Sequence, residues 1–104
     1  MNEYCVILVT CPDRASGMKI GGALVEEKLA ACANLVEGMT SIYRWKHAIH
    51  RDAEVLLIIK TRQGRFADVE KRVLALHPYE APEIIACDIT AGNASYLKWI
   101  EENT

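Results

Sequence analysis

Two short segments of this chain are apolar at every position. Residues 5–9 read Cys-Val-Ile-Leu-Val, and residues 55–59 read Val-Leu-Leu-Ile-Ile. Both have the length and the β-branched content of a strand that is buried on both faces. A sheet with one face in water alternates apolar and polar side chains instead. The fold must therefore cover both faces of these two strands.

The first apolar run leads into a helix. Residues 10–13 read Thr-Cys-Pro-Asp and predict a turn, and Asp13 is placed to cap a helix from Arg14 to about residue 31. Three glycines inside this segment each cost roughly 1 kcal/mol relative to alanine in a helix. This helix must therefore be stabilised by packing against the sheet.

The remaining segments complete the pattern. Residues 33–49 are extended in character, and the polar stretch 47–54 predicts a hairpin turn into the second apolar run. Apolar side chains in residues 66–76 recur in steps of three and four, which predicts an amphipathic helix. Residues 83–90 predict a last strand, and Asn93 is placed to cap a short C-terminal helix.

The predicted order is therefore β-α-β-β-α-β followed by a helix. This order predicts one α+β domain, residues 1–104, with the ferredoxin-like (split βαβ) fold: a four-stranded antiparallel sheet with two helices on one face. No segment remains to cover the second face of the sheet. We therefore expect a closed homo-oligomer whose sheets pack together around a symmetry axis.

Composition excludes several classes of protein. The 104 residues carry a net charge of −2 and no long run of one sign, so a nucleic-acid partner is not expected. The apolar runs are too short for a signal sequence or a membrane span, so we expect a cytoplasmic protein with no membrane partner. The sequence also lacks the common hydrolase, nucleotide-binding and metalloprotease motifs, and we expect no enzymatic activity.

The cysteines are expected to be mostly buried free thiols. Their spacing is irregular, their flanks are apolar and no secretion signal precedes them. Cys11, in the predicted loop after the first strand, is expected to be half exposed. The four cysteines are Cys5, Cys11, Cys32 and Cys87.

Six segments, in order over nearly the whole chain, resemble one known family. They are residues 8–13, 27–34, 41–45, 60–61, 77–84 and 96–99, which include Lys-Leu-Ala-Ala-Cys and His-Pro-Tyr-Glu. Together they resemble the CutA family of divalent-cation tolerance proteins. The resemblance implies a cytosolic homotrimer of ferredoxin-like subunits, built like the PII signalling proteins. It also implies an association with copper and other divalent cations, and no established reaction.

His77 and Cys11 are the candidate metal ligands, because imidazole and thiolate suit copper and zinc. In members of the family that this chain resembles, the ligands suggested for copper are a cysteine on the first strand and two adjacent histidines before the Pro-Tyr pair. The matching positions here are Val9, Leu76 and His77, so one of three is kept. A structural role for His77 at the end of its helix is the alternative. No obligatory cofactor is expected, and Cu(II) or another divalent cation is the candidate ligand.

Two further histidines, His47 and His50, lie in the stretch predicted to form the hairpin turn. Such a pair would chelate a metal weakly, with Glu54 or across subunits. The family usually has glycine at position 47, and histidine adopts a positive φ less easily than glycine does.

A second candidate site combines aromatic and charged side chains. Lys60 is expected to close the third strand and Glu83 to open the fourth, so that the two lie near one another. Such strand ends form pockets at subunit boundaries, which suits a small-molecule effector or a protein partner. The alternative is an ion pair and aromatic packing that only stabilise the trimer. The candidate cleft residues are Tyr43, Trp45, Lys60, Tyr79, Glu80 and Glu83.

The leading hypothesis from sequence is a cytosolic homotrimer that binds divalent cations, copper foremost, weakly or at inter-subunit sites. The alternative is a PII-like regulatory trimer that binds a small effector or a protein partner in its inter-subunit clefts. A stable scaffold without a ligand is the third hypothesis.

Overall fold

The predicted order of strands and helices is confirmed by the computed structural model, which describes residues 3–104. The first two residues of the predicted domain lie outside that range. The elements are β1 (Tyr4–Cys11), α1 (Arg14–Glu26), β2 (Cys32–Trp45), β3 (Ala48–Arg62), the 3-10 turn η1 (Gln63–Arg65), α2 (Phe66–Leu76), β4 (Ile84–Asp88) and α3 (Ala94–Glu102).

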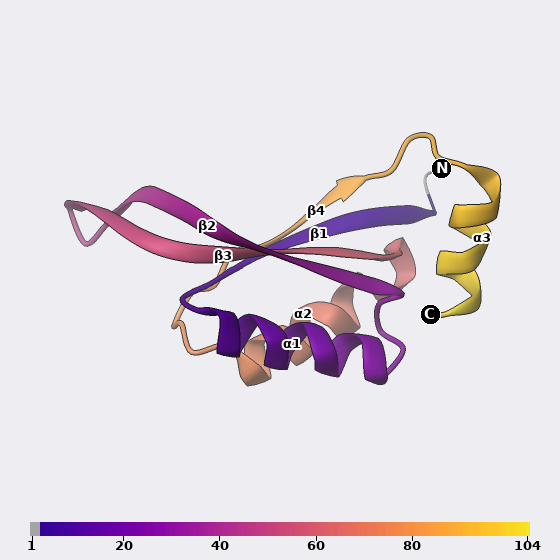
Figure 1. The fold of residues 1–104 in the computed structure, drawn as a ribbon, viewed down its shortest axis with the longest axis horizontal. Coiled ribbons are helices and arrows are strands. Elements are labelled where there is room, and N and C mark those ends of the chain that lie inside the picture. Colours follow the sequence, from indigo (N-terminus) through magenta and orange to yellow (C-terminus); the bar gives the residue numbers. More distant parts are fainter. Residues whose placement is uncertain (1–2) are drawn as a thin grey trace.

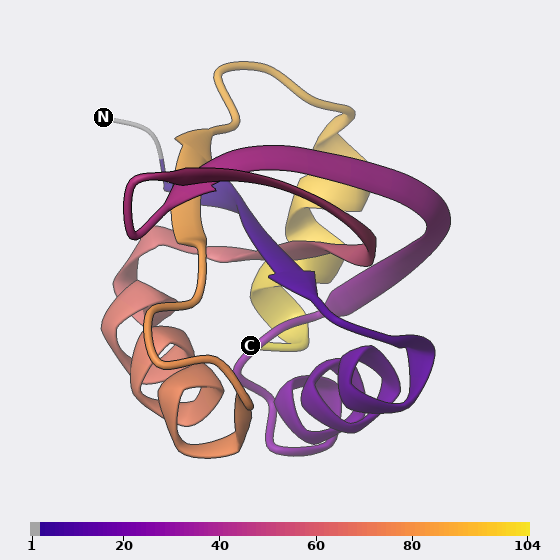
Figure 2. The same cartoon turned by 90° about the vertical axis from the view of Figure 1, so that its left-hand side faces the viewer.

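The four strands form one antiparallel sheet in the order β2-β3-β1-β4. Helices α1 and α2 lie side by side on one face of this sheet, and α3 stands at the end of the sheet away from the β2–β3 turn (Figures 1 and 2). This arrangement is the predicted ferredoxin-like fold, with a short C-terminal helix.

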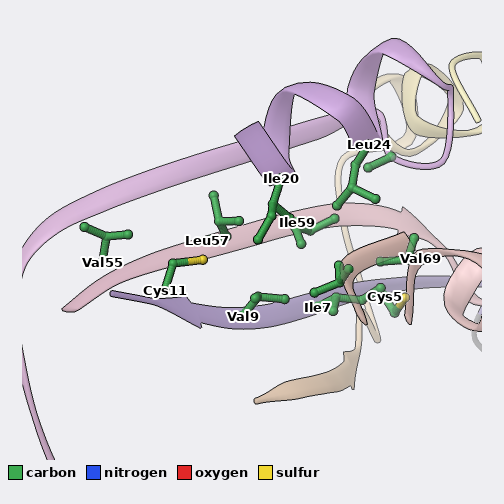
Figure 3. Packing of buried hydrophobic residues seen from close by; sticks show 12 residues of the cluster. Cys5, Ile7, Val9, Cys11, Ile20, Leu24, Val55, Leu57, Ile59 and Val69 are labelled. Carbon is green, nitrogen blue, oxygen red and sulfur yellow. The ribbon is translucent and has the colours of Figure 1, made fainter. Parts of the chain in front are cut away.

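The core lies between the sheet and the two helices. Alternate residues of β1, which are Cys5, Ile7, Val9 and Cys11, are fully buried in it together with side chains of β3, α1 and α2 (Figure 3). The residues between them on β1 are half exposed. Within one protomer the apolar runs are therefore buried on one face only, as expected from a chain with no segment left to cover the other face.

The opposite side of the sheet, which we call the second face, carries a continuous set of apolar side chains. Cross-strand pairs place Val36 beside Leu56, and Leu8 between Ile58 and Ile85. Val36 and Ile85 are exposed, and the others are half exposed. Within residues 3–104, α3 reaches only one end of the sheet and leaves these side chains open to solvent. The second face consists of Val6, Leu8, Val36, Leu56, Ile58 and Ile85.

Helix α1 begins as predicted and ends earlier than predicted. The Asp13 carboxylate accepts the Ser16 N–H at 2.8 Å, which caps the first turn. The helix ends at Glu26 because Lys28 adopts a positive φ of 59°, which a right-handed helix cannot accommodate. At its sheet-facing side, Gly17 lets the helix approach closely, since a Cβ atom there would lie 2.8 Å from Leu35 Cδ1.

The β2–β3 hairpin is longer than predicted. Its turn consists of Lys46 and His47 alone, with φ angles of 48° and 66°, which is the pattern of a type I′ turn. The polar stretch after it is part of β3, because its residues pair with those of β2. The hairpin therefore projects beyond the helices (Figure 1).

The last two elements are close to prediction. Strand β4 covers residues 84–88 of the predicted 83–90. Asn93 caps α3 as predicted, and its side chain accepts the Tyr96 N–H at 3.1 Å.

Candidate functional site

His77 is a buried residue at the end of α2, with both ring nitrogens bonded within the protein. The Tyr79 N–H donates to Nδ1 at 3.1 Å, and Nε2 lies 2.7 Å from the Thr10 carbonyl oxygen. Since Nδ1 accepts, Nε2 carries the hydrogen and donates it to Thr10. A metal would have to displace one of these bonds. The geometry therefore supports the structural alternative for His77.

Cys11 is not the half-exposed loop thiol that the sequence predicted. Strand β1 continues to this residue, and its side chain is fully buried beside Val55 and Leu57 (Figure 3). Burial, followed by the charges of Glu54 and Asp13, raises the pKa of the Cys11 thiol to about 11. The thiolate is the form that ligates metals, and at neutral pH this thiol keeps its proton.

The other three cysteines differ in exposure. Cys5 is buried, Cys32 is partly exposed and Cys87 is exposed. The expectation of mostly buried thiols is therefore met by Cys5 and Cys11, and it is wrong for Cys87. Cys87 lies on β4, which is a strand at the edge of the sheet.

The described side chains of one protomer do not form a metal centre. Within residues 3–104, no group of three or more His, Cys, Asp or Glu side chains lies close enough together to hold an ion. His47 is exposed in the turn, while His50 lies in β3 and stacks on Tyr43 with ring centroids 5.4 Å apart. His50 is thus not a residue of the turn, as the sequence suggested.

The structure brings most of the second candidate site together. A cleft of about 630 Å³ lies between the β2–β3 hairpin and the loop that follows α2. Tyr43 and Trp45 line it from β2, and their spacing puts both on one face of the strand. Tyr79, Glu80 and Glu83 line it from the loop.

Lys60 lies elsewhere, and the expected proximity to Glu83 is wrong. Lys60 pairs with Val6 of β1, whereas Ile84, directly after Glu83, pairs with Val9. Three residues along a strand span about 10 Å, and β1 also separates the two strands. The Lys60 ammonium instead donates a hydrogen bond to the Asn34 side chain.

Glu54 is the cleft residue that the sequence reasoning missed. It is only 8% exposed although it lines the cleft, and its Oε2 accepts a 2.6 Å hydrogen bond from the Tyr79 hydroxyl. Burial, then this bond and the Glu54 charge, raise the pKa of Tyr79. The sequence does contain a signal for Glu54, which is its position directly before the apolar run 55–59. Side chains alternate between the two faces of a strand, so Glu54 lies on the same side of β3 as the second face.

Tyr43 is held in a similar way. Its hydroxyl donates to the Asp52 carboxylate across the hairpin, and this hydrogen bond is the main cause that raises the pKa of Tyr43. Two of the aromatic side chains in the cleft are thus anchored by carboxylates. The cleft combines aromatic walls with acidic groups.

Fold and cleft together define a ferredoxin-like α+β protein with a long β2–β3 hairpin and an open apolar sheet face. Residues 5–103 match the family described as CutA1 divalent ion tolerance protein. The chain belongs to this family.

Curated relatives and solved structures agree with this assignment. The divalent-cation tolerance protein CutA of Thermus thermophilus is 50% identical over 99 residues, with 95% of this chain and 96% of that protein covered. The Thermus structure has a TM-score of 0.95 at 50% identity and covers 97% of this chain and 98% of its own. CutA1 from Oryza sativa has a TM-score of 0.96 at 42% identity, with 99% and 94% covered.

Two other relatives bear on location and length. The chloroplastic CutA protein of Arabidopsis thaliana is 46% identical over 95% of this chain, which spans 54% of that protein. The structure of the periplasmic divalent cation tolerance protein CutA from Archaeoglobus fulgidus has a TM-score of 0.94 at 36% identity, with 96% and 97% covered. In the described part of this chain, none of the helices has the length and apolar character needed to cross a membrane.

Proposed function

We propose that this protein acts in divalent-cation tolerance, copper foremost, as a cytoplasmic homotrimer that carries out no catalytic step. The observation that carries the proposal is the family match over residues 5–103, with relatives named for divalent-cation tolerance. Because other relatives are named for the chloroplast and the periplasm, fractionation of the native cells tests the cytoplasmic part. Recovery with a periplasmic or organellar marker would overturn it.

The open second face supports the homotrimer. Its apolar side chains span all four strands, and exposed apolar patches of this kind mark interaction surfaces. A closed ring of three copies buries the same patch on each copy. Light scattering is expected to give three times the protomer mass of 11.6 kDa, and a monomer mass at micromolar concentration would overturn the proposal.

A matched pair of variants tests which surface is used. Ile85 on the second face is 50% exposed, and Leu74 on the outer side of α2 is 53% exposed. Ile85→Glu is expected to dissociate the trimer, because it places a charge in the proposed interface. Leu74→Glu introduces the same charge at the same exposure and is expected to leave the mass unchanged.

We place the cation sites between protomers, and we expect them to be weak. The support is that the described residues of one protomer hold no group of three ligands, and that His77 and Cys11 are engaged within the fold. Calorimetric titration with Cu(II) is expected to show binding to the trimer that is lost in the dissociated Ile85→Glu variant. No heat at millimolar copper would overturn the proposal.

The cleft supports a second candidate function, which is a PII-like regulatory trimer that binds a small effector or a protein partner. The observation in its favour is the convergence of Tyr43, Trp45, Tyr79, Glu80 and Glu83 on one cavity. A thermal-shift screen against metabolites of all charge classes tests it. A hit that is weakened by Trp45→Leu supports this function, and a screen without hits leaves the trimer as a scaffold.

A further inference from the structure

Glu54 is a buried carboxylate that has no cationic partner among the described residues. None of the ion pairs found within residues 3–104 includes it, and the Tyr79 hydroxyl provides its hydrogen bond. Burial of an ionised carboxylate is costly unless a positive charge is close by. Because Glu54 lines the cleft, a ligand in the cleft is placed to supply that charge.

The rest of the lining has the same sign. Glu80 and Glu83 add two carboxylates, and no Lys, Arg or His side chain is among the described residues that line the cleft. A concave surface of one sign raises the local concentration of the opposite charge. The cleft therefore favours a cation and disfavours a phosphate or carboxylate ligand.

The aromatic walls indicate what kind of cation this is. Tyr43, Trp45 and Tyr79 all line the cleft, and aromatic faces attract organic cations. The Trp45 ring already has one such neighbour, since the Lys46 ammonium lies 5.9 Å from its centroid. A volume of about 630 Å³ is the size of a small-molecule site.

A bare metal ion fits this lining less well. The carboxylates are not close enough to form a group of three ligands within the described residues. The faces of the aromatic rings carry no metal-binding atom, and the Tyr43 and Tyr79 hydroxyls already donate to carboxylates. The ring faces can instead pack against the apolar part of an organic molecule.

We propose that the cleft binds an organic ammonium ion with an apolar body, its charge paired with Glu54 and its body packed against the aromatic rings. This inference rests on the second candidate function above and names the ligand class for it. The free Oε1 lone pairs of Glu54 accept an N–H of the ammonium group, while Oε2 keeps its hydrogen bond with Tyr79.

The test uses three probes of one shape and different charge, titrated calorimetrically into the wild-type assembly. Benzylammonium is the cation, benzyl alcohol the neutral match and benzoate the anion. Because a hydrogen bond to a charged group contributes about 1.5–3 kcal/mol, benzylammonium is expected to bind roughly tenfold to a hundredfold more tightly than benzyl alcohol. Benzoate is expected to show no binding.

Two variants assign the binding to the cleft. Glu54→Gln keeps the size of the side chain and an oxygen for the Tyr79 hydroxyl, and it is expected to remove the preference for benzylammonium over benzyl alcohol. Glu70→Gln is the control, because Glu70 is an exposed residue of α2 on the other side of the sheet. Trp45→Leu is expected to weaken binding. Its control is Trp99→Leu on α3, which is expected to leave binding unchanged; the two tryptophans are similarly exposed, at 42% and 41%.

Several outcomes would overturn the inference. They are equal affinities for the three probes, a Glu54→Gln variant that binds like wild type, and displacement of benzylammonium by Cu(II) alone, which would make the cleft a metal site. Hits from the metabolite screen that are all anionic or neutral would overturn the ammonium class and leave the effector function standing. No binding by any probe or metabolite would overturn both.

Discussion

The Tyr79 hydroxyl donates a hydrogen bond of 2.6 Å to the Glu54 carboxylate, and this bond joins the loop after α2 to β3. The same loop is fixed a second time by His77, which bridges the Tyr79 backbone and the Thr10 carbonyl. The wall of the cleft is therefore attached to two neighbouring strands, β1 and β3. A pre-formed wall reduces the entropy that a ligand must lose on binding.

Removing the Tyr79 hydroxyl is expected to destabilise the fold. Tyr79→Phe leaves the buried Glu54 carboxylate without its donor, and the free energy of unfolding should fall by about 1–3 kcal/mol. Urea denaturation measures the change. The control is Tyr96→Phe, at an exposed tyrosine of α3, which should change stability by less than about 0.5 kcal/mol. Equal effects of the two variants would contradict the role given to Tyr79.

His77 is expected to matter for stability and not for copper. His77→Ala leaves the Thr10 carbonyl and the Tyr79 N–H without partners, which should cost about 1–3 kcal/mol of unfolding free energy. The heat of Cu(II) binding to the assembled protein should be unchanged, because both ring nitrogens are engaged within the fold. Loss of copper binding in a variant that remains folded and trimeric would show that His77 is a ligand.

The buried thiols predict a loss of stability in alkali. The native fold raises the pKa of Cys5 and Cys11 from 9.0 to about 11, chiefly through burial. Above pH 9 the unfolded chain therefore releases protons that the native state keeps, and the free energy of unfolding should fall as the pH rises from 9 to 11. Two pKa units correspond to a loss on the order of 2 kcal/mol per thiol.

Urea midpoints at several pH values between 8 and 11 measure this slope. Cys11→Ala should flatten it, since one of the two buried thiols that contribute to the slope is removed. Cys87→Ala, at an exposed cysteine, should leave the slope as in wild type. A slope that does not respond to Cys11→Ala would contradict the assignment.

The hairpin turn offers a stabilising substitution. His47 has a φ of 66°, a conformation that costs a non-glycine residue about 1–2 kcal/mol. Because glycine is more flexible in the unfolded chain, the net gain from His47→Gly should be up to about 1 kcal/mol. Ala48→Gly, one residue further and in β3, should instead lower stability by roughly 0.5–1 kcal/mol. Thermal or urea unfolding of both variants checks the sign.

Two glycines of α1 should respond in opposite directions. A Cβ at Gly17 would lie 2.8 Å from Leu35 Cδ1 and 3.2 Å from Val55 Cγ2, whereas Gly22 has no atom within 4 Å of that position. Gly22→Ala should therefore stabilise the helix by about 1 kcal/mol, and Gly17→Ala should destabilise it by roughly 1–3 kcal/mol through overpacking. A stabilising Gly17→Ala would show that the helix shifts without cost.

The order of the elements and both helix caps were predictable from local signals. Asp13 and Asn93 each precede a helical pattern, and each caps its helix. The register of the strands was not predictable, because an apolar run looks the same when it is shifted by one or two residues. That is why Lys60 was placed beside Glu83, when its actual neighbour is Asn34.

The candidate site was predictable in part for the same reason. Tyr43 and Trp45 share a face through their spacing alone, and the stiff loop from Pro78 brings Tyr79 to them. The burial of Cys11 depends on how far β1 extends, and the bonds of His77 depend on where β1 ends. Both depend on which strands and loops come together in the fold, and a single sequence does not reveal these contacts.

The position of β1 in the sheet also determines when the fold can be completed. Although β1 is synthesised first, its two neighbours are β3 and β4, which lie far along the chain. The β2–β3 hairpin closes through a two-residue turn and can form early, but β1 must wait for partners of high sequence separation. Strand β4, which pairs with β1 alone, therefore enters the sheet last, and the apolar run of β1 stays unpaired until β3 has been synthesised.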